Sequence, residues 1–97
     1  MPYFDNELPS FGHDAAGADA FAEVIAASSG NTGYHNISVF CETHDAIVSL
    51  DGGTTEHIRV IADQPPQVYS GIWVDAAVHA KNAVGGSNYA NLTVHVW

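Results

Sequence analysis

Short segments in which apolar and polar residues alternate recur along most of this chain. The clearest is 91–97, where Leu92, Val94 and Val96 occupy every second position. Successive side chains of a β-strand point to opposite faces, so such alternation is typical of a strand with one buried and one exposed side. The pattern constrains the chain to an all-β fold before any other property is considered.

Six further segments are predicted to be strands, and loops rich in Gly, Pro, Ser and Asn separate them. They are 20–27, 34–42, 44–50, 55–62, 68–74 and 76–82. The alanines of 20–27 also suit a helix, but the clear loop that follows favours a strand. Short strands at intervals of about ten residues are typical of sandwiches and barrels. We therefore predict a small antiparallel β-sandwich, jelly-roll or Ig-like, of about seven strands.

One turn in this series has a recognisable chemistry. The pair Gly52-Gly53 lies between two β-rich segments, and both central positions of a type I′ turn need a positive φ, which glycine adopts without strain. A two-residue loop at this point pairs Asp51 with Thr54 and sets Ile47 opposite Ile58.

The first residues follow a different pattern. Residues 1–19 contain two prolines and two glycines and no sustained period, so we expect an extended N-terminal arm at 1–19 and the sandwich domain at 20–97. The apolar residues of the arm are spaced too irregularly for a helix or strand face: Tyr3, Phe4, Leu8 and Phe11. We expect such an arm to become ordered against a neighbouring surface.

The charge balance limits the possible partners. Two basic residues stand against 11 acidic ones, for a net charge of −9. Binding to a phosphate backbone needs clustered Lys and Arg, so neither nucleic acid nor an anionic membrane surface is an expected partner. Charged residues make up only 13% of the chain, which favours association with other proteins.

The candidate chemical groups form no recognised motif. Cys41 is alone, so no disulfide within the chain is expected, and six histidines occur without a short pair of the kind that zinc sites show. His79 and His95 lie on the polar faces of an expected C-terminal hairpin, but two imidazoles do not complete a site. Neither a nucleophile elbow nor a phosphate loop is present. We expect no metal, no cofactor and no enzymatic activity.

Aromatic residues are the feature most open to a functional interpretation. Four of them are candidates for a flat platform that stacks sugars: Tyr69, Trp73, Tyr89 and Trp97. Burial in the core or in a subunit interface is the alternative, and it is commoner for Trp and Tyr. An indole on the last residue predicts that something docks on it.

The second half of the chain resembles the small β-sandwich decoration, or cement, proteins of tailed bacteriophage heads. The resemblance covers roughly 46–97. It rests on the turn at 51–54, the strand end Ala80-Lys81-Asn82, the loop 86–89 (Gly-Ser-Asn-Tyr) and the closing strand with Leu92-Thr93-Val94.

This resemblance implies a non-enzymatic virion protein, made in the host cytoplasm, that binds the outer capsid surface. It implies contact with the major capsid protein, bridging of neighbouring capsid subunits and a homo-oligomer, with a trimer favoured. The interface candidates are Tyr3, Phe4, Leu8, Phe11, Tyr89 and Trp97. The alternative function is a carbohydrate-binding module of a tail fibre or spike.

Overall fold

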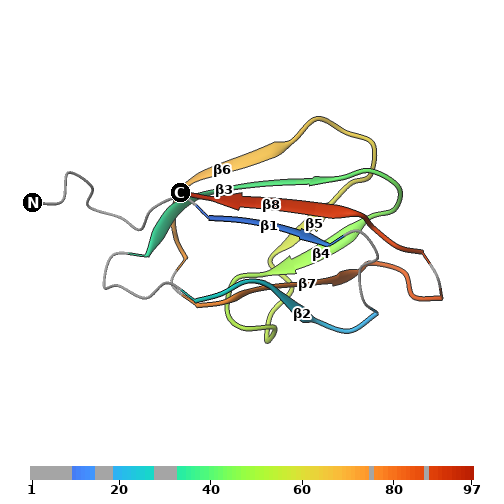
Figure 1. Ribbon diagram of the computed structural model, residues 1–97, viewed down its shortest axis with the longest axis horizontal. Helices are drawn as coiled ribbons and strands as arrows, with labels where there is room; N and C mark the ends of the chain where they lie inside the picture. Colours follow the sequence, from blue (N-terminus) through green and yellow to red (C-terminus); the bar gives the residue numbers. More distant parts are fainter. Residues whose placement is uncertain (1–9, 15–18, 28–32, 75, 87) are drawn as a thin grey trace, which may run out of the picture.

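The computed structural model describes residues 10–14, 19–27, 33–74, 76–86 and 88–97, and every regular element in this part of the chain is a β-strand (Figure 1). The strands are β1 (Ser10–Asp14), β2 (Ala22–Ile25), β3 (Tyr34–Cys41), β4 (Ala46–Ser49), β5 (Ile58–Val60), β6 (Gln67–Val74), β7 (Val78–Asn82) and β8 (Leu92–Val96). The described residues include no helix long and apolar enough to cross a membrane.

The strands form two four-stranded antiparallel sheets. Sheet A has the order β1-β8-β3-β6 and sheet B the order β2-β7-β4-β5. The pairing is nested: β1 pairs with β8, β2 with β7, β3 with β6, and β4 with β5. A ribbon of paired strands rolled up in this way is the jelly-roll form of the β-sandwich.

The core lies between the two sheets, and alternation along the strands supplies it. On β8, Leu92, Val94 and Val96 are all buried. On β3, Ile37, Val39 and Cys41 are inaccessible, as the period of two predicts. The predicted all-β antiparallel sandwich is confirmed.

The first strand differs from the sequence prediction. Residues 10–14 were expected in the extended arm, yet they form β1, an eighth strand that pairs with β8 from Ser10 opposite Val96 to Asp14 opposite Leu92. The alternation is hidden because Gly12 contributes no side chain to the pattern. The remaining parts of the predicted arm, 1–9 and 15–18, lie outside the described residues.

The β4–β5 connection is also different from the prediction. Val48 pairs with Ile58, and Ile47 pairs with Arg59, so the register is shifted by one residue. A shift of one residue exchanges the two faces of a strand, and here it places Val48 and Ile58 together in the core. The predicted two-residue loop is wrong, because the turn runs from the end of β4 at Ser49 to the start of β5 at Ile58.

Asp51 organises this longer turn. Its Oδ1 accepts hydrogen bonds from the Thr55 amide at 2.9 Å, the Thr54 amide at 3.1 Å and the Ser49 hydroxyl at 2.7 Å. Gly52 and Gly53 do adopt the expected positive φ, at 79° and 91°. Hydrogen bonds from Thr55 and Ser49 hold the pKa of the Asp51 carboxyl well below its usual range.

A pH dependence of stability follows from this turn. A carboxyl whose pKa is lower in the folded than in the unfolded protein stabilises the fold above the unfolded pKa, about 3.9 for Asp. That contribution is lost as the pH falls below this value. We expect urea unfolding to show a larger loss of stability between pH 6 and pH 3 (about these values) for the wild type than for Asp51→Asn, whose amide does not titrate. Parallel losses in the two proteins contradict this assignment.

Candidate functional site

The outer face of sheet A carries the candidate site. On β8 the side chains of Val94 and Val96 are buried in the core. Because neighbours along a strand point to opposite faces, Thr93, His95 and Trp97 project from the side of the sheet that faces away from sheet B.

One row of side chains crosses this face over all four strands. Phe11 of β1 lies opposite His95 of β8, His95 lies opposite Ser38 of β3, and Ser38 lies opposite Val68 of β6. Directly paired residues share a face of the sheet. The row therefore links the two edges of sheet A through side chains that lie outside the core.

A β-bulge turns two more side chains of β3 onto this face. The amides of His35 and Asn36 both donate to the Trp97 carbonyl, at 3.0 and 2.9 Å, so two residues of β3 oppose one residue of the neighbouring chain segment. Tyr34 and Ile37, on either side of this pair, are buried. His35 and Asn36 consequently project outward beside Trp97.

Two histidine–tryptophan ring pairs occupy the same end of the sheet. The ring centroids of His35 and Trp73 are 5.2 Å apart, and those of His95 and Trp97 are 5.0 Å apart. With Phe11, these rings come from every strand of sheet A or from the residue after it, at the end where the C-terminus lies (Figure 1). We call Phe11, His35, Trp73, His95 and Trp97 the aromatic band.

A shallow depression adjoins the band. Its volume is about 190 Å³, and it is lined by His35, Gly71, Ile72 and Trp73. Gly71 has a φ of 73° at the irregular part of β6, and no atom lies within 4 Å of the position that a Cβ would take. The exposed Trp73 side chain forms one wall of this depression.

The side chains around the band are uncharged when its histidines are neutral. The described side chains on this face of sheet A, from Trp97 near one end of the sheet to Phe40 near the other, are aromatic, aliphatic, hydroxyl, amide or imidazole groups. His13 Nδ1 and Thr93 Oγ1 lie 2.8 Å apart within hydrogen-bond reach. Glu42 follows the last residue of β3, and its Oε2 accepts a hydrogen bond of 2.8 Å from Asn91. In a chain with a net charge of −9, this surface is set apart from the acidic remainder.

The predicted interface residues separate into three groups. Phe11 and Trp97 come together in the aromatic band, although 86 positions separate them. Tyr89 lies in the loop before β8, at the opposite end of that strand, where its carbonyl accepts a hydrogen bond from the Thr43 hydroxyl. The other three candidates, Tyr3, Phe4 and Leu8, lie outside the described residues.

The predicted four-aromatic platform is wrong as a single surface. Tyr69 pairs with Ile37, a core residue, and therefore leaves the sheet on the side opposite the band. Tyr89 is at the far end of β8, so only Trp73 and Trp97 share the face. Sequence reasoning missed His35 and His95 as partners of these indoles. The spacing of His95 and Trp97, two positions apart in an alternating strand, is the signal that predicts one of the pairs.

The histidines do not converge. The predicted C-terminal hairpin is wrong, because β7 and β8 belong to different sheets. His79 pairs with Ser49 on the outer face of sheet B, and His95 lies on the outer face of sheet A. Within the described ranges, no group of three or more His, Cys, Asp or Glu side chains is placed to hold a metal ion.

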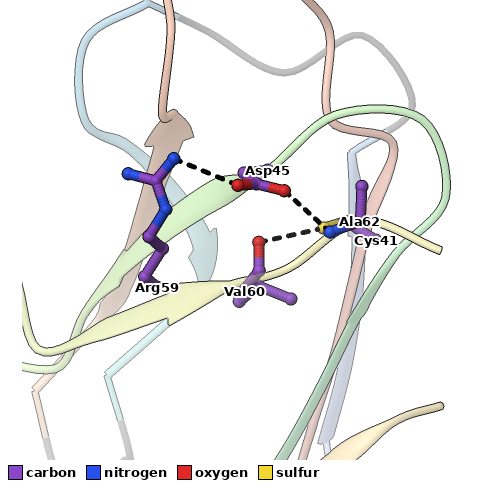
Figure 2. A network of polar contacts seen from close by, with 5 residues as sticks. All are labelled: Cys41, Asp45, Arg59, Val60 and Ala62. Atoms are coloured by element: carbon purple, nitrogen blue, oxygen red, sulfur yellow. Dashed lines mark hydrogen bonds and ion pairs between the residues drawn. The ribbon is translucent and has the colours of Figure 1, made fainter. Parts of the chain in front are cut away.

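A cluster of polar contacts joins β3, β4 and β5 at the end of the sandwich opposite the aromatic band; its residues are drawn in Figure 2. Asp45 accepts hydrogen bonds from the Ala62 amide at 2.8 Å and from Arg59 at 3.0 Å, and these, the amide first, lower the pKa of its carboxyl. The Cys41 thiol donates to the Val60 carbonyl at 3.4 Å, and burial raises the pKa of this thiol. Both carboxylate oxygens of Asp45 accept hydrogen bonds within the chain, so we assign this cluster a structural role, the stabilisation of the strand ends.

The fold and the site together define an eight-stranded jelly roll with an uncharged aromatic band on one outer face. No protein-family model, curated protein or solved structure matches the chain. We therefore argue the function from the band and its surroundings.

Proposed function

We propose that the protein is a non-enzymatic virion structural protein, a decoration protein that binds the outer surface of a tailed-phage head. In this proposal the aromatic band contacts the major capsid protein and the bound molecule bridges capsid subunits. The observation that carries the proposal is the neutral aromatic surface on an otherwise acidic protein. The cores of protein–protein interfaces are enriched in aromatic residues and depleted of charged ones, which is the composition of this surface.

Exposure of the band supports a contact role. The side chain of Phe11 is 65% exposed and that of Trp73 is 54% exposed. Burial of large apolar side chains away from water is favourable. Where a few residues dominate an interface, aromatic residues supply much of the affinity. A partner that covers the band buries both indoles and Phe11 without removing a charged side chain from water.

The test is attachment to heads. The heads for this assay are expanded, lack decoration protein and are assembled from the major capsid protein that the same genome encodes. We expect the purified protein to co-sediment with them saturably. The double variant Trp73→Ala/Trp97→Ala is expected to raise the Kd for heads at least about 100-fold, the effect of removing two dominant interface residues. Circular dichroism checks that the variant remains folded.

The matched control is Tyr89→Ala. Tyr89 is also an exposed aromatic residue, half accessible to solvent, but it lies at the opposite end of β8 from the band. We expect this variant to bind heads as the wild type does. The proposal fails if the wild type does not bind heads, or if the two variants lose the same affinity.

One observation favours a second function, a carbohydrate-binding module of a tail fibre or spike. The depression beside Trp73 offers an accessible indole next to the His35 imidazole, and small-ligand sites combine aromatic walls with a few polar groups. In that case, neutral oligosaccharides quench tryptophan fluorescence saturably, Trp73→Ala abolishes the quenching, and no binding to heads is observed.

A further inference from the structure

The described strands leave four sheet edges: β1 and β6 in sheet A, and β2 and β5 in sheet B. An edge strand presents unpaired N–H and C=O groups, and proteins commonly protect it by short length or by a charged side chain. Two of these edges have both protections: β2 and β5 are 4 and 3 residues long and contain Glu23 and Arg59. β1 is 5 residues long.

β6 has neither protection. It is 8 residues long, and its sequence QVYSGIWV contains no charged residue and no proline. Among the described residues, seven large hydrophobic side chains are exposed, and three of them are on this strand: Val68 at 57%, Tyr69 at 39% and Trp73 at 54%. Backbone groups that no described strand pairs with and accessible apolar side chains therefore coincide on one edge.

The first half of β6 is regular enough to pair with another strand. Residues 67–70 pair with β3 in unbroken register, from Gln67 opposite Val39 to Ser70 opposite Asn36. Beyond Ser70 the register shifts and Gly71 takes a positive φ, which bends the edge away from a straight path. The accessible template is accordingly the segment 67–70.

We propose that residues 67–69 pair antiparallel with the same residues of a second copy of this chain, across a two-fold axis at Val68, because directly paired residues share a face of the sheet. Such pairing sets like residues close to one another, and like charges facing each other across strands destabilise the pair. An uncharged edge tolerates this arrangement, whereas the edges with Glu23 or Arg59 bring like charges together. The two A sheets then form one continuous sheet of eight strands.

The two-fold pair has a consequence for attachment. Both aromatic bands lie on the same face of the joined sheet, so one dimer presents two contact surfaces to a capsid lattice. This consequence rests on the proposed function, whereas the pairing itself does not. The dimer is proposed in place of the trimer that the resemblance to decoration proteins implies.

Sedimentation equilibrium of the full chain tests the pairing. We expect the wild type to sediment as a dimer of the 10.3 kDa chain. Val68→Lys places an ammonium group on each copy at the joined edge, and we expect it to raise the dimer Kd at least about tenfold, because like charges in an interface repel. Val84→Lys is the matched control. Val84 is 59% exposed in the loop after β7, and this variant is expected to dimerise as the wild type does.

Three outcomes overturn the proposal: a wild type that is monomeric at its highest soluble concentration, a wild type that is a trimer, or a dimer that Val68→Lys leaves intact. Ser70→Lys, on the same exposed edge, repeats the test if circular dichroism shows that Val68→Lys is misfolded. Head binding by a wild-type monomer overturns the pairing alone. An intact dimer that does not bind heads overturns the decoration function alone.

Discussion

Replacing Gly12 with alanine is expected to lower the free energy of unfolding by about 3 kcal/mol, the upper part of the usual range for inserting an atom into a packed site. A Cβ at this position lies 2.5 Å from the Val24 carbonyl oxygen and 2.6 Å from Val24 Cγ1. The carbonyl belongs to the backbone of β2, so it cannot move aside as a flexible side chain can. Urea unfolding at neutral pH measures the loss.

Gly85→Ala is the control for Gly12→Ala. At Gly85 a new Cβ meets the Asp19 carboxylate at 3.4 Å, an ordinary contact with a side chain that can adjust. We expect a stability change within about 0.5 kcal/mol, as for most surface substitutions. Equal losses in the two variants contradict the close approach of β1 to Val24.

Asn82→Asp is expected to cost about 3 kcal/mol at neutral pH, the usual scale for an uncompensated buried charge. Asn82 is only 3% exposed. Its Oδ1 accepts from the Ala90 amide at 3.0 Å, and its Nδ2 donates to Asp19 Oδ1 at 3.2 Å. The substitution keeps the acceptor but replaces the donor with a carboxylate oxygen that faces another carboxylate.

The pH dependence identifies the cause of this loss. Burial and the neighbouring Asp19 raise the pKa of a carboxyl introduced at position 82 above its unfolded value. The deficit relative to the wild type is therefore largest above that raised pKa and shrinks as the pH falls through it, because the protonated group donates again. Urea unfolding of both proteins across acidic pH measures this difference.

Asn91→Asp is the matched control. The Asn91 amide also donates to a carboxylate, Glu42 Oε2, but this hydrogen bond is exposed to solvent. Asn91 Oδ1 is buried, but the oxygen that replaces the amide nitrogen faces Glu42 in solvent, where repulsion between charges is weak, so we expect a smaller loss than that of Asn82→Asp. A loss as large as that of Asn82→Asp indicates that burial is not what makes position 82 sensitive.

The sequence predicts the strands of this fold well where the alternation of buried and exposed side chains, which the pleat of a strand imposes, is enough to identify them. Val94 and Ile37 are buried at the positions that a period of two assigns to the core. The pleat does not determine register. Asp51 gathers the Thr54 and Thr55 amides into a long turn, and this side-chain chemistry overrides the short turn that Gly52-Gly53 favours.

The candidate site is harder to predict because it depends on which strands are neighbours. Phe11 and Trp97 are each recognisable as aromatic residues without an assigned place in the core. They share one face of sheet A because β8 lies beside β1, a neighbour relation that local periodicity does not specify. The outward position of His35 depends on a bulge opposite Trp97, and a strict alternation predicts the opposite face for it.

Nested pairing also determines the order in which the chain can fold. The innermost pair joins Val48 to Ile58, whereas the outermost joins Ser10 to Val96. Loop closure costs more entropy as the loop lengthens, so formation of each inner pair shortens the loop that the next pair has to close. β8 lies in the middle of sheet A, and this sheet therefore cannot assemble on the ribosome before residues 92–96 have been synthesised. Slow folding, on the scale of milliseconds to seconds that non-local β-topologies show, is the kinetic consequence of placing β8 between β1 and β3, which precede it in the sequence.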